Sequence, residues 1–334
     1  MVTDRKEGAP LVKIIGFQAI AVRSEVSSCV ERHCVKEEIQ KNGMRLMVAG
    51  PREFILDTLR SAVVFAQISG EKRPQISVAT ADDSGAACVA DRFPALGLVA
   101  DVSFIRCDPS NLGWNPALKG QRFDACFLGW PDETLTLAGG NQLARSALCE
   151  VIEVLAFVNG APQGDIDMVL PDNMRLVSVF EGGARAIENG FLQLELEAKS
   201  QREAYLNTLK PEERAERERK GEDFSWEGMP ELKKESNRVA VLHGTIKKKI
   251  WESVQDAGEK ALESTLESLS VSEHSRWMAE KVMDGFVYGA ETVSRRRIHR
   301  DLRPWGELSV SDKDKDRNQV RKVLGLPLLP PAKA

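Results

Sequence analysis

Short apolar runs alternate with helical stretches through the first half of the chain, and this alternation constrains the fold more than any other feature. The runs occupy residues 45–49, 76–79, 102–105, 125–128, 168–170 and 176–180. Such runs are typical of parallel strands covered on both faces. The sequence therefore predicts a doubly wound α/β domain over residues 44–192, with helices between the runs. The longest predicted helix is the Ala/Leu-rich segment 135–157.

Length and charge limit the classes of protein to consider. The chain has 334 residues, which is long for one hydrophobic core and predicts two domains. Its formal net charge of −4 argues against a general nucleic-acid binder, which would be basic. No apolar run is long enough to cross a bilayer, and no signal-peptide pattern is visible. We therefore expect a cytoplasmic protein without membrane insertion.

The six cysteines do not form a metal-binding pattern. None belongs to a C-x-x-C pair, and several lie in apolar surroundings, which is typical of reduced, buried thiols. Cys29, His33 and Cys34 lie close together in the sequence. Their spacing matches no common zinc pattern, and no second pair of ligands follows. The sequence alone thus predicts no metal site.

The turn after the first predicted strand is where a dinucleotide-binding fold carries its glycines, which let the backbone approach the pyrophosphate. Only the first of them, Gly50, is present, because Arg52 and Ile55 occupy the other two positions. An acid that could bond a ribose follows the second run, at Asp82 or Asp83, although acids there are more often turn or cap residues. We expect no resident cofactor; the alternative is NAD(P) bound at Gly50 and Asp82.

The second half of the chain has a helical pattern. Residues 199–222 are dominated by charge and predict a solvated helix or connecting loop. From there to Leu324 no strand is clear, and the proline-rich tail that follows is expected to lie extended. The sequence thus predicts an N-terminal segment over 1–43 and a mainly helical second domain over 193–334.

Residues 270–308 carry most of the functional signal. Ser270-Val-Ser-Glu273 has the form of a capping box and predicts the start of a helix, which Gly285 would end before a turn at 286–289. One face of this helix carries His274, Trp277, Met278 and Lys281. An apolar stripe is usually core, but burying a His or Lys without a partner is costly, so the rim of a cleft for an anionic ligand is the other interpretation. The arginines that follow are either a solvated face or a source of charge for phosphates: Arg295, Arg296, Arg297 and Arg300.

Part of this pattern has a second copy upstream. Residues 225–241 resemble residues 304–320, since each contains a tryptophan, an acid, a lysine-rich turn and an Asn/Arg pair. The helix of the first copy would hold Tyr205 where the second holds Trp277. Two such halves, about 199–250 and 265–325, would pair about a pseudo-twofold axis. Their cleft would offer aromatic rings to a planar base and cations to its phosphate; chance similarity is the alternative.

The same stretch resembles the RyR domain, the repeat named after ryanodine receptors. The shared positions are His274, Trp277, Lys281, Gly285, Tyr288, Gly289, His299, Leu302, Pro304, Trp305, Leu308, Asp316 and Arg317. Ser236-Asn237-Arg238 resembles the ending of the repeat. The chain departs from the family pattern at Phe286, Ala290 and Arg300. With the α/β domain ahead of it, the arrangement is similar to prokaryotic proteins that join a TrkA-N-like domain to an RyR domain.

The resemblance implies a Rossmann-like α/β domain followed by a mainly α-helical RyR domain that binds an adenine-type or signalling nucleotide. The candidate ligand-binding residues are Trp277, His274, Lys281, Tyr288, Trp305, Tyr205, Asn237, Arg238 and His243. We expect a non-enzymatic homodimer that senses or sequesters the nucleotide. The alternatives are an NAD(P)-dependent enzyme and an accessory subunit of a channel or defence complex.

Overall fold

A computed structural model describes residues 17–70, 72–82, 84–160, 170–186, 192–206, 211–219, 221 and 223–329. Its centre is a six-stranded sheet in which every pairing is parallel and the order is β3-β2-β1-β5-β7-β8. These strands are β1 (Arg45–Ala49), β2 (Gln75–Thr80), β3 (Asp101–Arg106), β5 (Ala125–Leu128), β7 (Val154–Val158) and β8 (Met174–Ser178). The strand order reverses between β1 and β5, as in doubly wound folds. The predicted α/β fold class is confirmed.

The sequence assigned one central strand wrongly. Segment 135–157 was expected to be a single helix, but the helix there, α5 (Glu133–Ala144), ends early and β7 follows. All five residues of β7 are buried, and a short, fully buried apolar run cannot be told from a helix by its periodicity. The run at 168–170 forms no strand at Leu170, and its first two residues lie outside the described residues.

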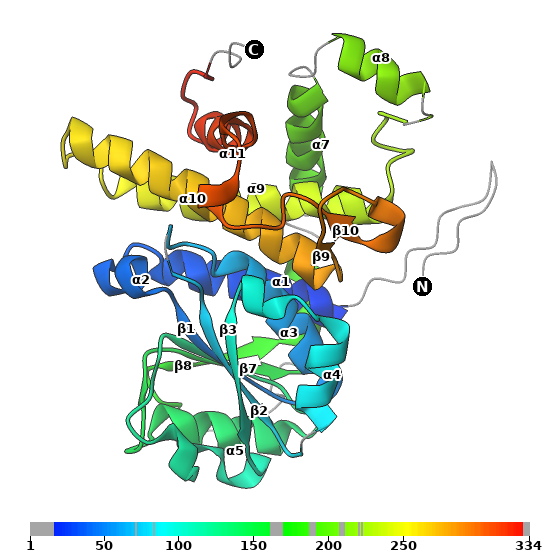
Figure 1. The fold of residues 1–334 in the computed structure, drawn as a ribbon. Coiled ribbons are helices and arrows are strands. Elements are labelled where there is room, and N and C mark those ends of the chain that lie inside the picture. Colours follow the sequence, from blue (N-terminus) through cyan, green and yellow to red (C-terminus); the bar gives the residue numbers. More distant parts are fainter. Residues whose placement is uncertain are drawn as a thin grey trace.

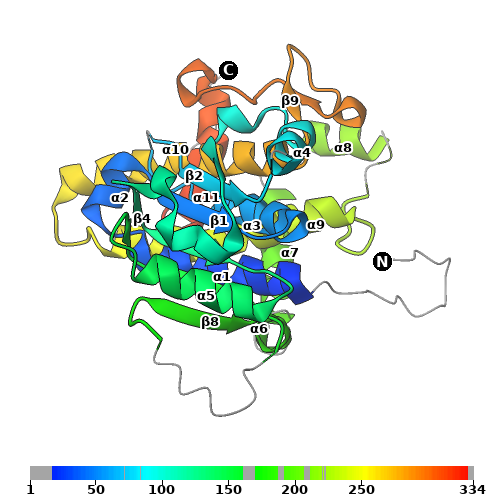
Figure 2. The ribbon, with the colours of Figure 1, turned by 90° about the horizontal axis from the view of Figure 1, so that it is seen from below.

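Helices cover both faces of the sheet. One face carries α1 (Phe17–His33), α3 (Arg52–Phe65), α4 (Ser84–Arg92) and α6 (Val179–Ala186), and the other carries α5 (Figures 1 and 2). A short helix, α2 (Glu37–Asn42), leads from α1 into β1. Two further short strands, β4 (Arg122–Phe123) and β6 (Glu150–Val151), pair with each other. The N-terminal segment therefore contributes α1, which packs against both α3 and α6.

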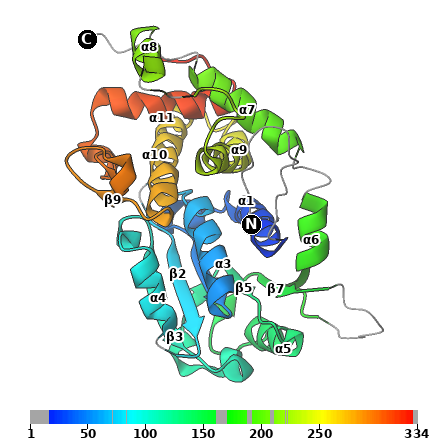
Figure 3. The same ribbon diagram turned by 90° about the vertical axis from the view of Figure 1, so that its right-hand side faces the viewer.

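The second half is mainly helical and forms a layer above α1 and α3 (Figure 3). Its helices are α7 (Leu192–Leu206), α8 (Pro211–Arg219), α9 (Glu231–Glu252), α10 (Glu259–Met283) and α11 (Val310–Val323). Two short strands, β9 (Val287–Tyr288) and β10 (Ile298–His299), pair in parallel, so the expectation of a region without strands was wrong. One hydrophobic cluster runs from Leu59 of α3 and Val26 of α1 to Ile246 of α9 and Leu269 of α10. The two parts of the chain thus share a core.

Helix α10 begins well before the predicted capping box. It starts at Glu259, after Gly258, and Ser270 lies inside it. The Ser270 hydroxyl donates to the Leu266 carbonyl one turn earlier, and the Ser272 hydroxyl donates to the Gln67 carbonyl of the α/β domain. Both hydroxyls are therefore used within or across helices rather than as caps. The predicted end is confirmed, because Gly285 follows the helix with a φ of 80°.

No helix in the part of the chain that the structure describes combines the length and the apolar character needed to cross a membrane.

Candidate ligand-binding site

Four aromatic side chains, two from α10 and two from the segment that follows it, contact one another. We call them the aromatic cluster: His274, Trp277, His299 and Trp305. The Trp277 ring stacks on His274 with centroids 5.8 Å apart and meets the edge of His299 at 4.8 Å. Trp305 lies 5.9 Å from His274. The indole of Trp277 is only partly buried. Trp277 is therefore packed against two neighbouring rings and the hydrophobic core, with part of the residue in contact with solvent.

His274 acts as a fixed support within this cluster. It is 3% exposed. Its Nε2 donates to the Arg303 carbonyl at 2.9 Å, and its Nδ1 lies 3.2 Å from an Asp316 carboxylate oxygen. Burial raises the pKa of Asp316, and the hydrogen bond from His274 opposes that rise. Because both ring nitrogens are engaged, His274 can orient Trp277 but has no nitrogen left for a ligand.

Cations surround the cluster on two sides. Burial lowers the pKa of His299, and the positive charges of Lys281, Arg300 and Lys315 lower it further against the opposing effect of Asp301. Each of these cations also has an acidic partner, at 3.8, 3.4 and 2.8 Å in turn: Glu280, Asp301 and Asp312. On the other side Lys313 Nζ and Arg317 Cζ lie 5.7 and 5.6 Å from the Trp305 ring centroid. A partly exposed ring bordered by cations suits a planar, negatively charged ligand.

Lys281 and Tyr288 lie at the edges of the cluster. Lys281 Nζ is 5.6 Å from the Phe286 ring centroid and 3.8 Å from a Glu280 carboxylate oxygen. Tyr288 is 54% exposed and pairs with His299 across the two short strands. The run of arginines from Arg295 to Arg297 is exposed, as a solvated face would be.

The candidate residues in the first half of the helical region do not lie at the aromatic cluster. Arg238 is 3% exposed and its guanidinium binds three carboxylates, those of Glu195, Glu231 and Glu235. Asn237 donates to the Lys233 carbonyl within α9 at 2.7 Å. These side chains form bonds within α9 and between α9 and α7, and they do not contact the aromatic cluster. The side chain of Tyr205 lies outside the described residues.

His243 lies beside a buried ionic group between α9 and α10, which we call the buried ion network: Lys247, Glu273, Arg276 and Glu280. Lys247 Nζ lies 2.5 Å from Glu273, whose carboxylate also accepts from Arg276 at 2.9 Å. Burial would raise the pKa of Glu273, but Arg276 and Lys247 outweigh it and hold that pKa far below its usual range. His243 is fully buried beside this network.

The cavity between the two halves of the helical region is not lined by aromatic side chains. A cavity of about 240 Å³ lies between α7, α9 and α11. Its lining residues are Glu197, Ser200, Gln201, Val241, Gly244, Thr245, Lys248, Lys322 and Val323. Lys322 Nζ donates to the Gln201 carbonyl there at 3.1 Å, and burial lowers its pKa. Among the described residues, the cavity between the halves is therefore not the predicted aromatic cleft. The aromatic side chains of the cluster all come from the second half of the helical region.

The carboxyl edge of the parallel sheet is closely packed. A Cβ on Gly50 would lie 2.4 Å from the Gly129 carbonyl oxygen and 2.7 Å from the Phe54 ring. Gly50 is therefore required for packing between β1 and β5, at the point where a doubly wound fold would receive a dinucleotide. Asp82 accepts from the backbone and hydroxyl of Ser84 at the start of α4, and these bonds lower its pKa. Asp83 lies outside the described residues.

His299 of the aromatic cluster and Asp316, which bonds His274, were not among the residues chosen from the sequence. Neither was Lys315, whose charge acts on His299. His299 and Asp316 could have been found, because both stand among the positions shared with the RyR pattern. Lys315 carries no such signal, and only the folding of α11 against α10 brings it near.

The family model for the RyR domain matches residues 258–329. The chain contains an RyR domain. The match runs from the start of α10 through β9, β10 and α11, and so includes the whole aromatic cluster. No curated protein and no solved structure matches the chain.

Proposed function

We propose that the chain is a non-enzymatic nucleotide-binding protein, in which the aromatic cluster of the RyR domain holds an adenine-type or signalling nucleotide. The base would stack on Trp277, and the phosphates would meet Lys281, Arg300 and Lys315. The proposal also includes a relationship of this chain to prokaryotic proteins that join a TrkA-N-like domain to an RyR domain. Binding would serve either to sense the nucleotide or to remove it from solution.

The observation that carries this proposal is the partly buried Trp277 ring between His274 and His299, with two cations over the neighbouring Trp305 ring. Base stacking on an aromatic side chain contributes about 1–3 kcal/mol per base. Phosphate binding by clustered Lys and Arg side chains adds charge-assisted hydrogen bonds. Lys313 and Arg317 place positive charge over the Trp305 ring, where it would meet the phosphates of a stacked nucleotide.

The α/β domain supports the alternative of an NAD(P)-dependent enzyme less well. The Phe54 ring packs against Gly50 and Gly129 where a pyrophosphate would approach, and Asp82 is engaged by Ser84. An accessory role in a channel or defence complex rests on no particular contact in the structure. Titration with NADH, followed by its fluorescence, separates the enzyme alternative from the RyR-domain proposal.

Calorimetry with a panel of mono-, di- and cyclic nucleotides tests the proposal. We expect Trp277→Ala to weaken binding of the active nucleotide by at least about fivefold, from the loss of about 1–3 kcal/mol of stacking. Two variants serve as controls: Trp114→Ala, an exposed tryptophan of the α/β domain, and Lys322→Gln in the cavity. Both should leave the affinity unchanged. No heat from any nucleotide would overturn the proposal, and a loss confined to Lys322→Gln would move the site to the cavity.

A further inference from the structure

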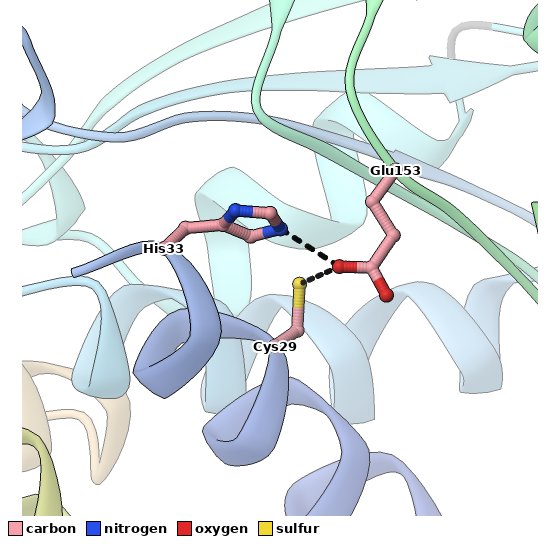
Figure 4. Close-up of side chains that lie close together, drawn as sticks. All are labelled: Cys29, His33 and Glu153. Carbon is pink, nitrogen blue, oxygen red and sulfur yellow. Dashed lines mark hydrogen bonds and ion pairs between the residues drawn. The ribbon is translucent and has the colours of Figure 1, made fainter. Parts of the chain in front are cut away.

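Three potential metal ligands converge where α1 meets the sheet: Cys29, His33 and Glu153 (Figure 4). Cys29 and His33 are four residues apart on α1 and therefore project from the same face of the helix. Glu153 lies just before β7, far away in the sequence. Their nearest ligand atoms all lie within 4.8 Å of one another, and all three residues are buried.

The two oxygens of Glu153 share one partner, Arg32, and otherwise differ. Oε1 accepts from Arg32 at 2.7 Å and lies 3.8 Å from Arg175. Oε2 accepts from Arg32 at 3.4 Å and faces the other two members of the group, with His33 Nε2 at 2.8 Å and Cys29 Sγ at 3.5 Å. Arg32 thus orients the carboxylate through both oxygens, and Oε2 is also directed at a thiol and an imidazole. A carboxylate that is oriented by outer partners is typical of metal sites.

We propose that Cys29, His33 and Glu153 bind a zinc ion through Sγ, Nε2 and Oε2. Sulfur, imidazole and carboxylate together are the ligand set that Zn²⁺ takes in proteins. Ligand atoms about 2.0–2.3 Å from a tetrahedral ion are separated by about 3.5 Å. Binding would therefore move His33 and Glu153 slightly apart and bring together any pair that now lies as far apart as 4.8 Å. Three protein ligands leave the fourth position of the ion for water.

Binding requires the Cys29 thiol to lose its proton to solvent, since the thiolate is the ligand. In the metal-free chain Nε2 donates to the Glu153 carboxylate, so binding also requires the imidazole proton to move to Nδ1 and free Nε2 for the ion. Nδ1 of His33 is buried and has no hydrogen-bond partner among the described residues. Because the thiol releases a proton when the ion binds, the affinity should rise with pH.

Titration of the full-length, metal-stripped protein with Co²⁺ tests the proposal, because a thiolate ligand gives cobalt a charge-transfer absorption band in the near ultraviolet. We expect one ion per chain, with the band present, and displacement of cobalt by an equal amount of Zn²⁺. Cys29→Ser should abolish the band, and His33→Ala should weaken binding by more than about a hundredfold, beyond what loss of an outer partner costs.

Cys34→Ser is the matched control, since Cys34 is another buried thiol next to α1 that bonds the Glu31 carbonyl instead of the group. It should bind cobalt like the parent chain. If a variant fails to fold, native mass spectrometry of the parent chain, with and without Zn²⁺, still decides the question. Absence of a one-to-one complex, or an unchanged band in Cys29→Ser, would overturn the proposal and leave a simple ionic tie between α1 and the sheet.

Discussion

The two halves of the helical region contain the same arrangement of three side chains but use it differently. In the first half Glu195 of α7 accepts from the Trp226 indole at 3.3 Å and from Arg238. In the second half the pKa of Glu267 of α10 is lowered by hydrogen bonds from Arg317 and, less strongly, from Trp305. The arginine follows the tryptophan by twelve residues in both. This correspondence supports the tandem repeat inferred from the sequence.

The halves differ in burial and in charge. The side chain of Arg238 is 4% exposed and has three carboxylate partners, whereas that of Arg317 is 28% exposed and also lies over the Trp305 ring. The first half thus uses its arginine as a structural centre. The second half leaves an arginine and a ring near solvent, next to the aromatic cluster. The comparison suggests that one half stabilises the fold while its counterpart is available to a ligand.

The largest effect should come from the buried ion network of the second half. Glu273→Ala leaves Lys247 and Arg276 buried with less compensation, which should lower the free energy of unfolding by about 3–5 kcal/mol. Position 201 of the first half corresponds to 273, because each lies four residues before the aligned Tyr205 or Trp277. Gln201→Ala should cost less than about 1 kcal/mol, because its side chain is only partly buried. Urea unfolding of both variants measures the difference; equal losses would contradict the asymmetry.

The matched arginines give the next largest contrast. Arg238→Ala removes charge-assisted hydrogen bonds from a buried group and should lower the free energy of unfolding by about 2 kcal/mol. Arg317→Ala removes a more exposed ion pair and should cost less than about 1 kcal/mol. Arg295→Ala, an exposed residue of the basic run, is the control and should change nothing measurable. A larger loss at Arg317 than at Arg238 would reverse the structural roles assigned to the two halves.

Mildly acidic pH should lower the free energy of unfolding through His243, which lies in the first half of the helical region. Burial and the nearby charge of Lys247 lower its pKa well below the usual value, so the unfolded chain binds this proton more readily than the folded one. Stability is therefore complete above the unfolded-state pKa of about 6.5 and falls as the pH drops below it, by up to about 1.4 kcal/mol per pH unit for this one group. Urea unfolding at pH 7.5 and pH 5.5 measures the loss, which should shrink in His243→Met. An unchanged pH dependence in that variant would assign the effect to another group.

The sequence could predict the parts of the molecule that depend on local patterns. It predicted five of the six sheet strands in whole or in part, and the end of α10 at Gly285, because apolar runs and a positive-φ glycine leave local signals. It could not predict β7, whose uniformly apolar residues lack a period. The start of α10 was wrong because Ser270 and Ser272 have hydroxyl partners that only the folded chain supplies.

The candidate site was predictable to a smaller extent. His274 and Trp277 were identified because helical spacing places them on one face, and the structure does bring them together with Trp305. The role of Arg238 as an ionic centre and the approach of Glu153 to α1 depend on contacts between distant segments. No spacing rule within a single sequence encodes such contacts.

The smallest and sharpest test concerns the indole nitrogens. Trp226→Phe and Trp305→Phe each remove one N–H donor to the matched glutamates while keeping an aromatic ring, and each should cost about 0.5–1.5 kcal/mol of unfolding free energy. For Trp226→Phe, in the first half, we expect no further loss of stability. In the second half phenylalanine also offers a weaker surface to the cations of Lys313 and Arg317, so Trp305→Phe should cost slightly more and depend more on salt. Unfolding measured at low and high salt separates the two variants; identical salt dependence would mean that the cations contribute nothing at Trp305.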